Sequence, residues 1–388
     1  KNSAMDNSTG NIGPMAYAFQ YMNISSRVEE ETKEHILGYN YPEEYQFMVQ
    51  DHWRSYPAIN KYWHYSLALI YTILFIASIT GNGIVIWIFS TSKALRSPSN
   101  MFVINLAVFD VMMMLEMPIF VLNSYHHHII GYQAVCNVYA TLGSISGFGG
   151  AITNAVIAYD RYKTISCPLD GRVTKSQALA LIVMTWMWSL PFTILPAFQV
   201  WGKFVPEGFL TTCSFDYLTE DHATRMFVLV CCIWDYFIPV FILCYYYSRL
   251  FGAVRTHEKM LREQAKKMNV KSLSNKDDGG ASVEIRIAKV AFTIFFMFVC
   301  AWTPYAFVTL VGAFGDRSIL TPVATMVPAV CAKTVSCIDP WVYAINHPKY
   351  RAELTKRLPW LGVQEKDPDT ASSSSTATSQ THHPTAAA

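Results

Sequence analysis

Charged residues are scarce in this sequence, and their scarcity excludes an ordinary water-soluble domain. Only 15% of the 388 residues are Asp, Glu, Lys or Arg, whereas 52% are hydrophobic. A soluble domain usually carries about 25% charged residues. Three stretches, 62–92, 176–201 and 290–315, contain no charged residue at all. Because about 20 apolar residues span the hydrocarbon core of a bilayer, each stretch predicts a transmembrane helix.

Other absences exclude further classes of protein. Residues 1–61 lack the apolar core of a cleavable signal peptide, so we expect the first span to act as the insertion signal. No nucleophile–base or metal-ligand spacing indicates an enzyme or a metal site, because the consecutive residues His126, His127 and His128 cannot share one helical face. The sequence shows neither a paired repeat nor a line of carboxylates along one pathway, which are the features that would indicate a transporter or a pump. Nothing indicates a nucleic-acid partner.

Four more segments hold only a few ionisable residues each, at roughly 97–124, 129–161, 226–248 and 318–345. Together with the three charge-free stretches they make seven spans. Prolines interrupt several of them, which a bundle tolerates because neighbouring helices satisfy the freed carbonyl groups. We therefore predict an all-α membrane protein, a seven-transmembrane helix bundle that occupies residues 58–348.

Basic residues are concentrated after the odd-numbered spans, which all end on the same side. They are Lys93, Arg96, Arg161, Lys163, Arg172, Lys175, Arg249, Arg255, Lys259, Arg262, Lys266, Lys267, Lys271, Lys349, Arg351, Lys356 and Arg357. The positive-inside rule puts this side in the cytoplasm and the N-terminal tail, residues 1–57, outside the cell. Sequons at Asn7 and Asn23 are then candidate glycosylation sites, although sequons also arise by chance.

Two segments follow the last span. In 349–362, bases alternate with Tyr350, Leu354 and Leu358, which predicts a short amphipathic helix on the inner leaflet. In 363–388, Ser and Thr dominate, and we expect a disordered cytoplasmic tail.

Two of the nine cysteines lie on the predicted outer, oxidising side of the membrane. Cys136 opens the third span, and Cys213 lies in the loop before the fifth. We predict a disulfide between them. The alternative is a pair of unrelated free thiols.

Lys333 lies well inside the seventh span, where a charge is costly and therefore indicates function. Burial favours the neutral amine, which can condense with an aldehyde to form a Schiff base. The alternative is a snorkelling or paired structural lysine. A protonated Schiff base needs a nearby anion. Glu207 is a candidate, because the predicted disulfide would pin its loop over the bundle, although a solvated loop acid is the simpler interpretation.

The triplet Asp160-Arg161-Tyr162 ends the third span at the cytoplasmic edge. Arg161 could pair there with Asp160 and with Glu284 at the start of the sixth span. Such a clamp would hold two helices together until it is broken.

These residues, with others in the same order, resemble the rhodopsin-like G-protein-coupled receptors over residues 50–365. The matching marks are Asn82, Asp110, Asp160-Arg161-Tyr162, Trp186, Pro239, Tyr247, Phe298, Trp302, Pro304 and the run Asp339-Pro340-Trp341-Val342-Tyr343. Lys333, seven residues before Pro340, occupies the position where the opsins of this family attach retinal. The resemblance implies a receptor rather than an enzyme.

Finer features are similar to arthropod visual opsins. The loop around His257-Glu258-Lys259 resembles theirs, which implies coupling to a G protein of the q class. Tyr139 stands where vertebrate visual opsins have their glutamate counterion, and Glu207 matches the alternative counterion of invertebrate opsins. The resemblance also places Gly147, Trp302 and Tyr305 in the retinal pocket.

The colour class depends on Glu116. Insect ultraviolet opsins carry a lysine in this part of the second span, and a cation would oppose protonation of the Schiff base. Glu116 and the run Cys337-Ile338-Asp339-Pro340-Trp341 are most similar to insect blue-sensitive opsins. The alternatives are an ultraviolet opsin, or a Glu116 that only forms an interhelical hydrogen bond.

The resemblance implies a visual pigment of the rhabdomeric photoreceptor membrane. Its cofactor would be 11-cis retinal or its 3-hydroxy form, 3-hydroxyretinal. Isomerisation would shift Trp302, loosen the contact between Arg161 and Glu284, and let the sixth helix move outward to expose the inner surface to the G protein. The resemblance also assigns Tyr247 and Tyr343 to G-protein activation. A receptor kinase would then phosphorylate the Ser/Thr tail, which would bind arrestin. A receptor for a diffusible ligand is the competing interpretation.

Overall fold

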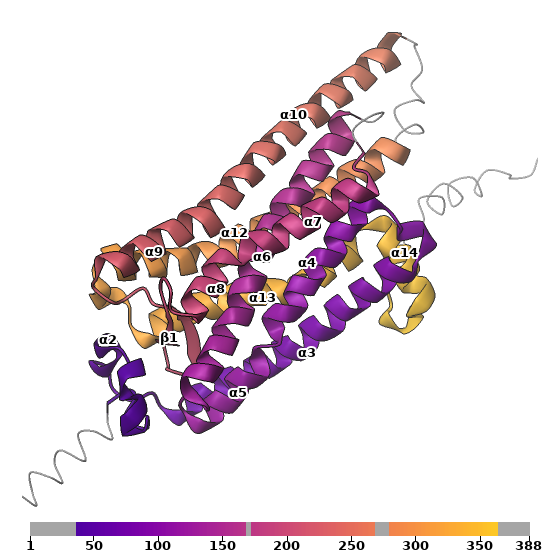
Figure 1. Cartoon of the computed structure of the whole chain (residues 1–388). Coiled ribbons are helices and arrows are strands. Elements are labelled where there is room, and N and C mark those ends of the chain that lie inside the picture. The colour runs from indigo at the N-terminus through magenta and orange to yellow at the C-terminus, as the bar shows by residue number, and fades with distance from the viewer. Residues whose placement is uncertain (1–35, 168–171, 268–278, 364–388) are drawn as a thin grey trace, which may run out of the picture.

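Long helices dominate the computed structural model, which describes residues 36–167, 172–267 and 279–363 (Figure 1). The helices of the bundle are α3 (Lys61–Thr91), α4 (Pro98–Met114), α5 (Met117–His126), α6 (Tyr132–Ser166), α7 (Lys175–Ser189), α8 (Pro191–Ala197), α9 (His222–Cys232), α10 (Ile238–Lys267), α12 (Gly279–Phe314) and α13 (Pro322–Asn346). The short elements are η1 (Glu43–Met48), α2 (Asp51–Arg54), η2 (Lys93–Leu95), β1 (Phe204–Glu207), β2 (Thr212–Phe215), η3 (Ile233–Phe237), η4 (Arg317–Ile319), α14 (Pro348–Arg357) and η5 (Pro359–Leu361).

The helices form the seven transmembrane spans that the sequence predicts, and we call each span a rod because some consist of two consecutive helices. Among the described residues, six rods are long and apolar enough to cross a membrane: 61–91, 98–126, 132–166, 175–197, 222–256 and 288–314. The seventh, α13, is less apolar because it contains Lys333 and Asp339, and it packs against α3, α4 and α12. At the centre of the bundle, α6 contacts α4, α7, α10 and α12.

Several rods begin at side chains that cap the free amide groups of the first turn. Asn60 accepts a hydrogen bond from the backbone of Tyr62 at the start of α3. Thr174 and Gln177 form a reciprocal capping box at the start of α7, and Asp221 caps α9. These caps satisfy donors that have no partner within the helix.

Three of the transmembrane helices are interrupted along their length. The second rod breaks at Leu115 and Glu116, next to Pro118 in the first turn of α5. The fourth breaks before Pro191. The fifth loosens into a π-helical turn, η3, which holds Asp235. Such breaks turn individual side chains away from the regular helical stripe.

A folded N-terminal segment, residues 36–57, covers one end of the bundle. This end also carries the antiparallel hairpin of β1 and β2, and we call it the hairpin end. Trp53 of the segment is fully buried, with 0% of its surface exposed. Residues 36–57 are therefore part of the fold and contribute to its core.

Hydrogen bonds hold this segment to distant parts of the chain. Tyr41 donates to the carbonyl of Leu210, at 2.9 Å, and Gln50 donates to Asp216 Oδ1, at 2.6 Å. The His52 ring contacts the carbonyl of Leu320, at 2.8 Å. Asn40 donates to the carbonyl of His127, at 2.8 Å, so the segment also contacts the histidine run.

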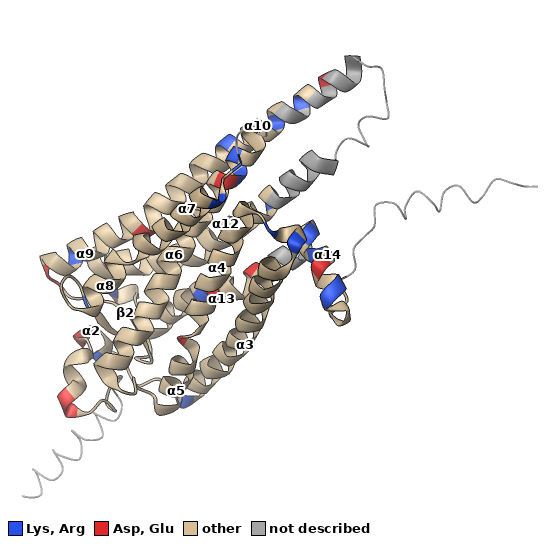
Figure 2. Cartoon of the chain, turned by 45° about the vertical axis from the view of Figure 1, so that its right-hand side comes forward, with Lys and Arg blue, Asp and Glu red and all other residues tan. Residues whose placement is uncertain are grey.

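Basic residues gather toward the opposite end of the bundle, on α14 and along α10 (Figure 2). Helix α14 lies across this end, and one residue, His347, separates it from α13 and caps its first turn. Tyr350 and Leu354 are buried, and the Tyr350 ring stacks on Phe89 with 5.2 Å between the ring centres. One face of α14 is therefore apolar and packed, as an amphipathic helix requires.

Candidate functional site

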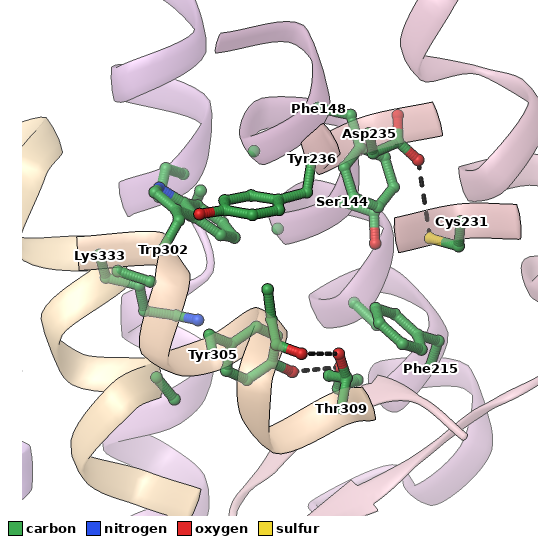
Figure 3. A pocket seen from close by; sticks show the side chains of 18 of the residues that line it. Ser144, Phe148, Phe215, Cys231, Asp235, Tyr236, Trp302, Tyr305, Thr309 and Lys333 are labelled. Carbon is green, nitrogen blue, oxygen red and sulfur yellow. Dashed lines mark hydrogen bonds between the residues drawn. The ribbon is translucent and has the colours of Figure 1, made fainter. Parts of the chain in front are cut away.

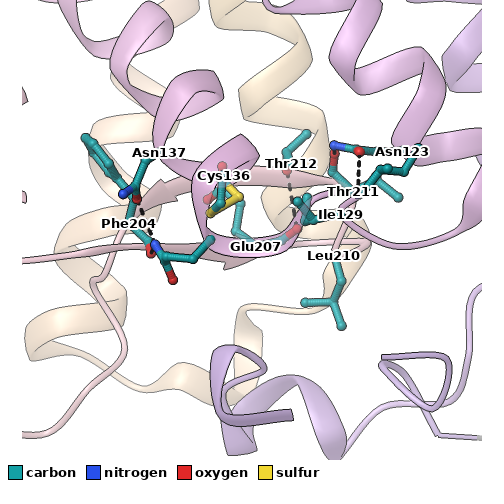
Figure 4. Close-up of a disulfide and its surroundings, with 12 residues drawn as sticks. Asn123, Ile129, Cys136, Asn137, Phe204, Glu207, Leu210, Thr211 and Thr212 are labelled. Carbon is teal, nitrogen blue, oxygen red and sulfur yellow. Dashed lines mark hydrogen bonds between the residues drawn. A yellow bond between two sulfur atoms is a disulfide. The ribbon is translucent and has the colours of Figure 1, made fainter. Parts of the chain in front are cut away.

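A disulfide ties the hairpin to the bundle, which confirms the predicted pairing of Cys136 with Cys213 (Figure 4). Their Cα atoms are 5.4 Å apart, and the bond closes a separation of 77 residues. Cys136 is on the first turns of α6, and Cys213 is in β2. The cross-strand partner of Cys213 is Pro206, so Glu207 lies beside the bridge.

Replacing Cys136 by Ser should destabilise the protein. A bridge across 77 residues removes loop entropy from the unfolded chain that corresponds to about 4 kcal/mol. Thermal unfolding of the purified protein in detergent should therefore begin at a clearly lower temperature. The matched control is Cys300→Ser, which changes an exposed free thiol. An unchanged unfolding curve for Cys136→Ser would show that the bridge does not contribute to stability.

Lys333 points from α13 into the interior of the bundle and forms an ion pair there. Its Nζ atom lies 3.1 Å from Oε1 of Glu116, whose side chain is 1% exposed. The Lys333 side chain is 15% exposed. Neither carboxylate oxygen of Glu116 has a hydrogen-bond partner apart from this ion pair. A buried carboxylate needs compensation, so Lys333 is its main source of stabilisation.

Two local features bring Glu116 to this position. It lies in the break between α4 and α5, so the chain there leaves the regular helical path. On the facing helix α6, residue 143 is a glycine, and a Cβ atom there would lie only 2.8 Å from Oε2 of Glu116. Gly143 therefore provides the space that the carboxylate occupies. Sequence reasoning identified Glu116 but had no signal for Gly143.

Glu207 lies at the hairpin side of the same region and is bonded differently. Tyr217 donates to its Oε2 atom, at 3.0 Å, and Tyr305 lies 3.2 Å from both oxygens. Burial raises the pKa of Glu207, whereas the charge of Lys333 and the two tyrosine hydrogen bonds oppose that rise. Among the described residues, no ion pair within 4.0 Å joins Glu207 to Lys333.

A cavity connects these residues to the middle of the bundle (Figure 3). Its lining includes Lys333, Glu116, Glu207, Gly147, Trp302 and Tyr305. A Cβ atom on Gly147 would lie 2.7 Å from the Trp302 ring, so the two helices are close there.

Tyr139 is not among the lining residues. Its ring is buried, and the ring centre lies 5.7 Å from Nζ of Lys333. Tyr139 therefore lies within cation–π distance of the amine.

The side of the cavity opposite Lys333 is formed by the fifth rod (Figure 3). Asp235 in η3 is 5% exposed, and its Oδ2 atom accepts a weak hydrogen bond from Cys231. Phe148, Phe215 and Tyr236 give this side an aromatic character. The cavity thus has an amine at one end and mostly apolar walls along its length, as ligand pockets typically do.

A polar cluster lies between the cavity and the other end of the bundle. Asp110 and Asp339 line a small pocket there with Asn154. Asn82 instead donates to the carbonyl of Ser336, at 2.7 Å, and links α3 to α13. These side chains form a polar core between the helices, with Asn82 at its edge.

The structure describes some of the residues that are predicted to take part in activation of the receptor. Arg161 Nη2 lies 2.6 Å from Asp160, and Ser99 donates to the same carboxylate, at 2.8 Å. Tyr247 is buried and stacks on Phe295, with 5.4 Å between the ring centres. Tyr162 contacts Tyr246.

Other predicted positions lie outside the described part of the chain. They are the side chains of Glu284 and Tyr343, the sequons at Asn7 and Asn23, and the tail from residue 364. The pairing of Arg161 with Glu284 therefore stays a prediction.

Comparison with known proteins confirms the predicted family and the seven-helix fold. Residues 81–343 match the 7 transmembrane receptor (rhodopsin family) model. Opsin-3 of Manduca sexta is 68% identical over 377 residues, which cover 97% of each chain. The blue-sensitive opsin of Apis mellifera is 58% identical, covering 89% of this chain and 91% of its own. The crystal structure of squid rhodopsin superposes with a TM-score of 0.78 at 34% identity, covering 86% of this chain and 96% of that one. The chain therefore belongs to the rhodopsin family of seven-transmembrane receptors, among the insect visual opsins.

Proposed function

We propose that this receptor detects light with 11-cis retinal, in its plain or 3-hydroxy form, bound covalently to Lys333 as a protonated Schiff base. Membership of the rhodopsin family implies signalling through a G protein. We further propose that this G protein is of the q class and that the receptor works in the rhabdomeric photoreceptor membrane.

One observation carries this proposal. The primary amine of Lys333 opens into a cavity inside an opsin-family bundle. Among the side chains that line this cavity, Lys333 is the one that can condense with an aldehyde. Its ion pair with Glu116 also suits a purely structural lysine, so attachment needs a direct test.

The residues present fit a long apolar aldehyde. Glu116 and Glu207 provide negative charge near the amine, and the aromatic side chains Phe148, Phe215 and Trp302 would hold a polyene. Gly147 leaves room beside Trp302. When bound, retinal would supply the light-driven change of shape. Trp302 would transmit this change, because it touches both α6 and the cavity.

The placement in the membrane follows from charge. The basic end around α14 would face the cytoplasm, and the hairpin end would face outward. In this orientation 1–57 is extracellular, 58–348 spans the membrane, 349–362 lies on the inner leaflet and 363–388 is cytoplasmic. Asn7 and Asn23 could then carry glycans, and a receptor kinase and arrestin would act on the tail.

We propose blue sensitivity. The blue-sensitive opsin of Apis mellifera is 58% identical to this chain, and the ultraviolet-sensitive opsin of the same organism is 50% identical. Glu116 provides a carboxylate beside Lys333, which favours a protonated, visible-absorbing linkage. An ultraviolet pigment is the alternative.

The test is to incubate the purified protein with 11-cis retinal and record its spectrum before and after illumination. We expect a visible band that changes with light. Borohydride reduction followed by peptide mapping should then find the retinyl group on Lys333. No adduct and no visible band would instead favour a receptor for a diffusible ligand.

A further inference from the structure

We propose that Asp235 determines which form of retinal the receptor takes, by bonding a hydroxyl group on the ring of the ligand. The inference rests on the proposed function, which leaves the plain and the 3-hydroxy forms open. It selects 3-hydroxyretinal and gives a specificity role to Asp235, a residue to which the family resemblance assigns none.

Attachment at Lys333 fixes the direction in which the ligand lies. Lys333 is on α13 and Asp235 is in η3 of the fifth rod, and both line the same cavity. The fifth rod forms the side of the cavity opposite Lys333 (Figure 3). A linkage to Nζ would hold the aldehyde end of retinal beside α13. The ring, which is the other end of the molecule, would therefore lie against the fifth rod.

The carboxyl group of Asp235 lacks the partners that a buried acid normally has. The residue is 5% exposed, and among the described residues its Oδ1 atom has no hydrogen-bond partner. Its Oδ2 atom accepts a hydrogen bond from the thiol of Cys231, at 3.6 Å, and a thiol is a weak donor. Buried polar atoms are nearly always paired, so Oδ1 indicates a partner that the described chain does not supply.

Other buried acids of the bundle differ from Asp235 in this respect. Asp160 pairs with Arg161, at 2.6 Å, and Glu116 pairs with Lys333, at 3.1 Å. Within the part of the chain that the structure describes, Asp235 forms no ion pair. Its carboxyl group is therefore available to a ligand in the cavity.

A hydroxyl group suits this position better than a plain hydrocarbon ring does. A hydroxyl both donates and accepts hydrogen bonds, so it can bond Asp235 whether the carboxyl group is charged or neutral. Phe148 and Phe215 on the same side of the cavity pack against a ring but offer no side-chain hydrogen bond to it. A plain ring would cover Asp235 with carbon and leave Oδ1 without a partner, which is costly in a buried site.

The experiment offers the purified, ligand-free receptor an equimolar mixture of 11-cis retinal and 11-cis 3-hydroxyretinal in the dark. Borohydride reduction then fixes the adducts, and peptide mass mapping gives the ratio of the two forms on Lys333. The wild-type protein should favour the hydroxylated form by about 10-fold, the factor expected for one hydrogen bond to a buried acid. Because both adducts form on the same folded molecules, the ratio does not depend on the yield of folded protein.

Variants assign the preference to one side chain. Asp235→Leu keeps a branched side chain that cannot bond a hydroxyl, so the two adducts should form in nearly equal amounts. Asp235→Asn can still donate and accept, and it should keep most of the preference. Thr309→Val is the matched control, because Thr309 lines the same cavity and its hydroxyl already donates to the carbonyl of Ala306, at 2.9 Å. It should keep the wild-type ratio.

The possible outcomes separate the inference from the proposed function. Nearly equal adducts in the wild-type protein, or a preference that Asp235→Leu leaves unchanged, would overturn the role of Asp235 while retinal attachment stands. If Asp235→Leu does not fold, Asp235→Ala makes the same comparison with a smaller side chain. Absence of both adducts from Lys333 in the wild-type protein would contradict the proposed function, and the role of Asp235 would fail with it.

Discussion

With Arg in place of Lys333, the purified receptor should fold but form no visible pigment when it is incubated with 11-cis retinal. Arginine keeps a positive charge beside Glu116, so the buried carboxylate still has a partner. Its guanidinium group does not lose a proton in proteins. It therefore offers no neutral amine for attachment, and we expect complete loss of the visible band.

The choice of Arg matters for interpretation. Lys333→Ala would leave Glu116 buried without its cation, and breaking a buried ion pair from one side typically costs about 3–5 kcal/mol. A missing pigment in the Ala variant could then reflect misfolding. Absorption spectra, borohydride trapping and a thermal unfolding curve of Lys333→Arg should be recorded together. A visible band in a well-folded Lys333→Arg protein would exclude Lys333 as the attachment residue.

Glu116→Lys should convert the visible pigment into one that absorbs in the ultraviolet. The substitution removes the carboxylate 3.1 Å from Nζ and places a second amine in the same enclosed space. Two cations in a low-dielectric site repel each other strongly, so the linkage loses its proton. The unprotonated linkage absorbs at shorter wavelength.

The spectrum at neutral pH measures this effect, and Glu116→Gln is the control. Gln removes the anion without adding a cation, so this variant should still show a visible band when the solution is made acidic. Glu116→Lys should stay in the ultraviolet over the same pH range. A Glu116→Lys protein that keeps its visible band at neutral pH would contradict an electrostatic role for this position.

Much of the fold could be predicted from the sequence, because a bilayer imposes long apolar runs that are visible residue by residue. The first span was expected at 62–92, and α3 runs from Lys61 to Thr91. The break before Pro191 follows from proline chemistry, but it divides a stretch, 176–201, that shows uniform hydrophobicity. The π-helical turn at 233–237 has no signal in the pattern of polar and apolar residues.

The folded segment 36–57 could not be predicted in the same way. It contains several aromatic residues but no apolar run long enough for a span, and its structure depends on partners far along the chain. Gln50 bonds Asp216 across 166 positions, and His52 contacts Leu320 across 268. No local periodicity encodes such contacts.

The site was predictable in its residue types and less so in its pairings. A charged lysine inside a transmembrane span is energetically costly and therefore rare, so Lys333 could be found from the sequence alone. Its observed partner, Glu116, is on another helix, and the contact depends on the break at 115–116 and on Gly143. The tyrosines that bond Glu207 likewise come together only through the hairpin and the disulfide.

The folded lid formed by residues 36–57 bears on how a ligand could reach the interior. A molecule arriving from the aqueous side would have to lift a layer that is anchored by Trp53 and by hydrogen bonds to Leu210, Asp216 and Leu320. In the part of the chain that the structure describes, this segment covers the hairpin end and leaves the flanks of the helices free, so a molecule dissolved in lipid would not have to displace it (Figure 1). The fold therefore favours entry of lipid-soluble ligands from the membrane over entry of water-soluble ligands from the aqueous side.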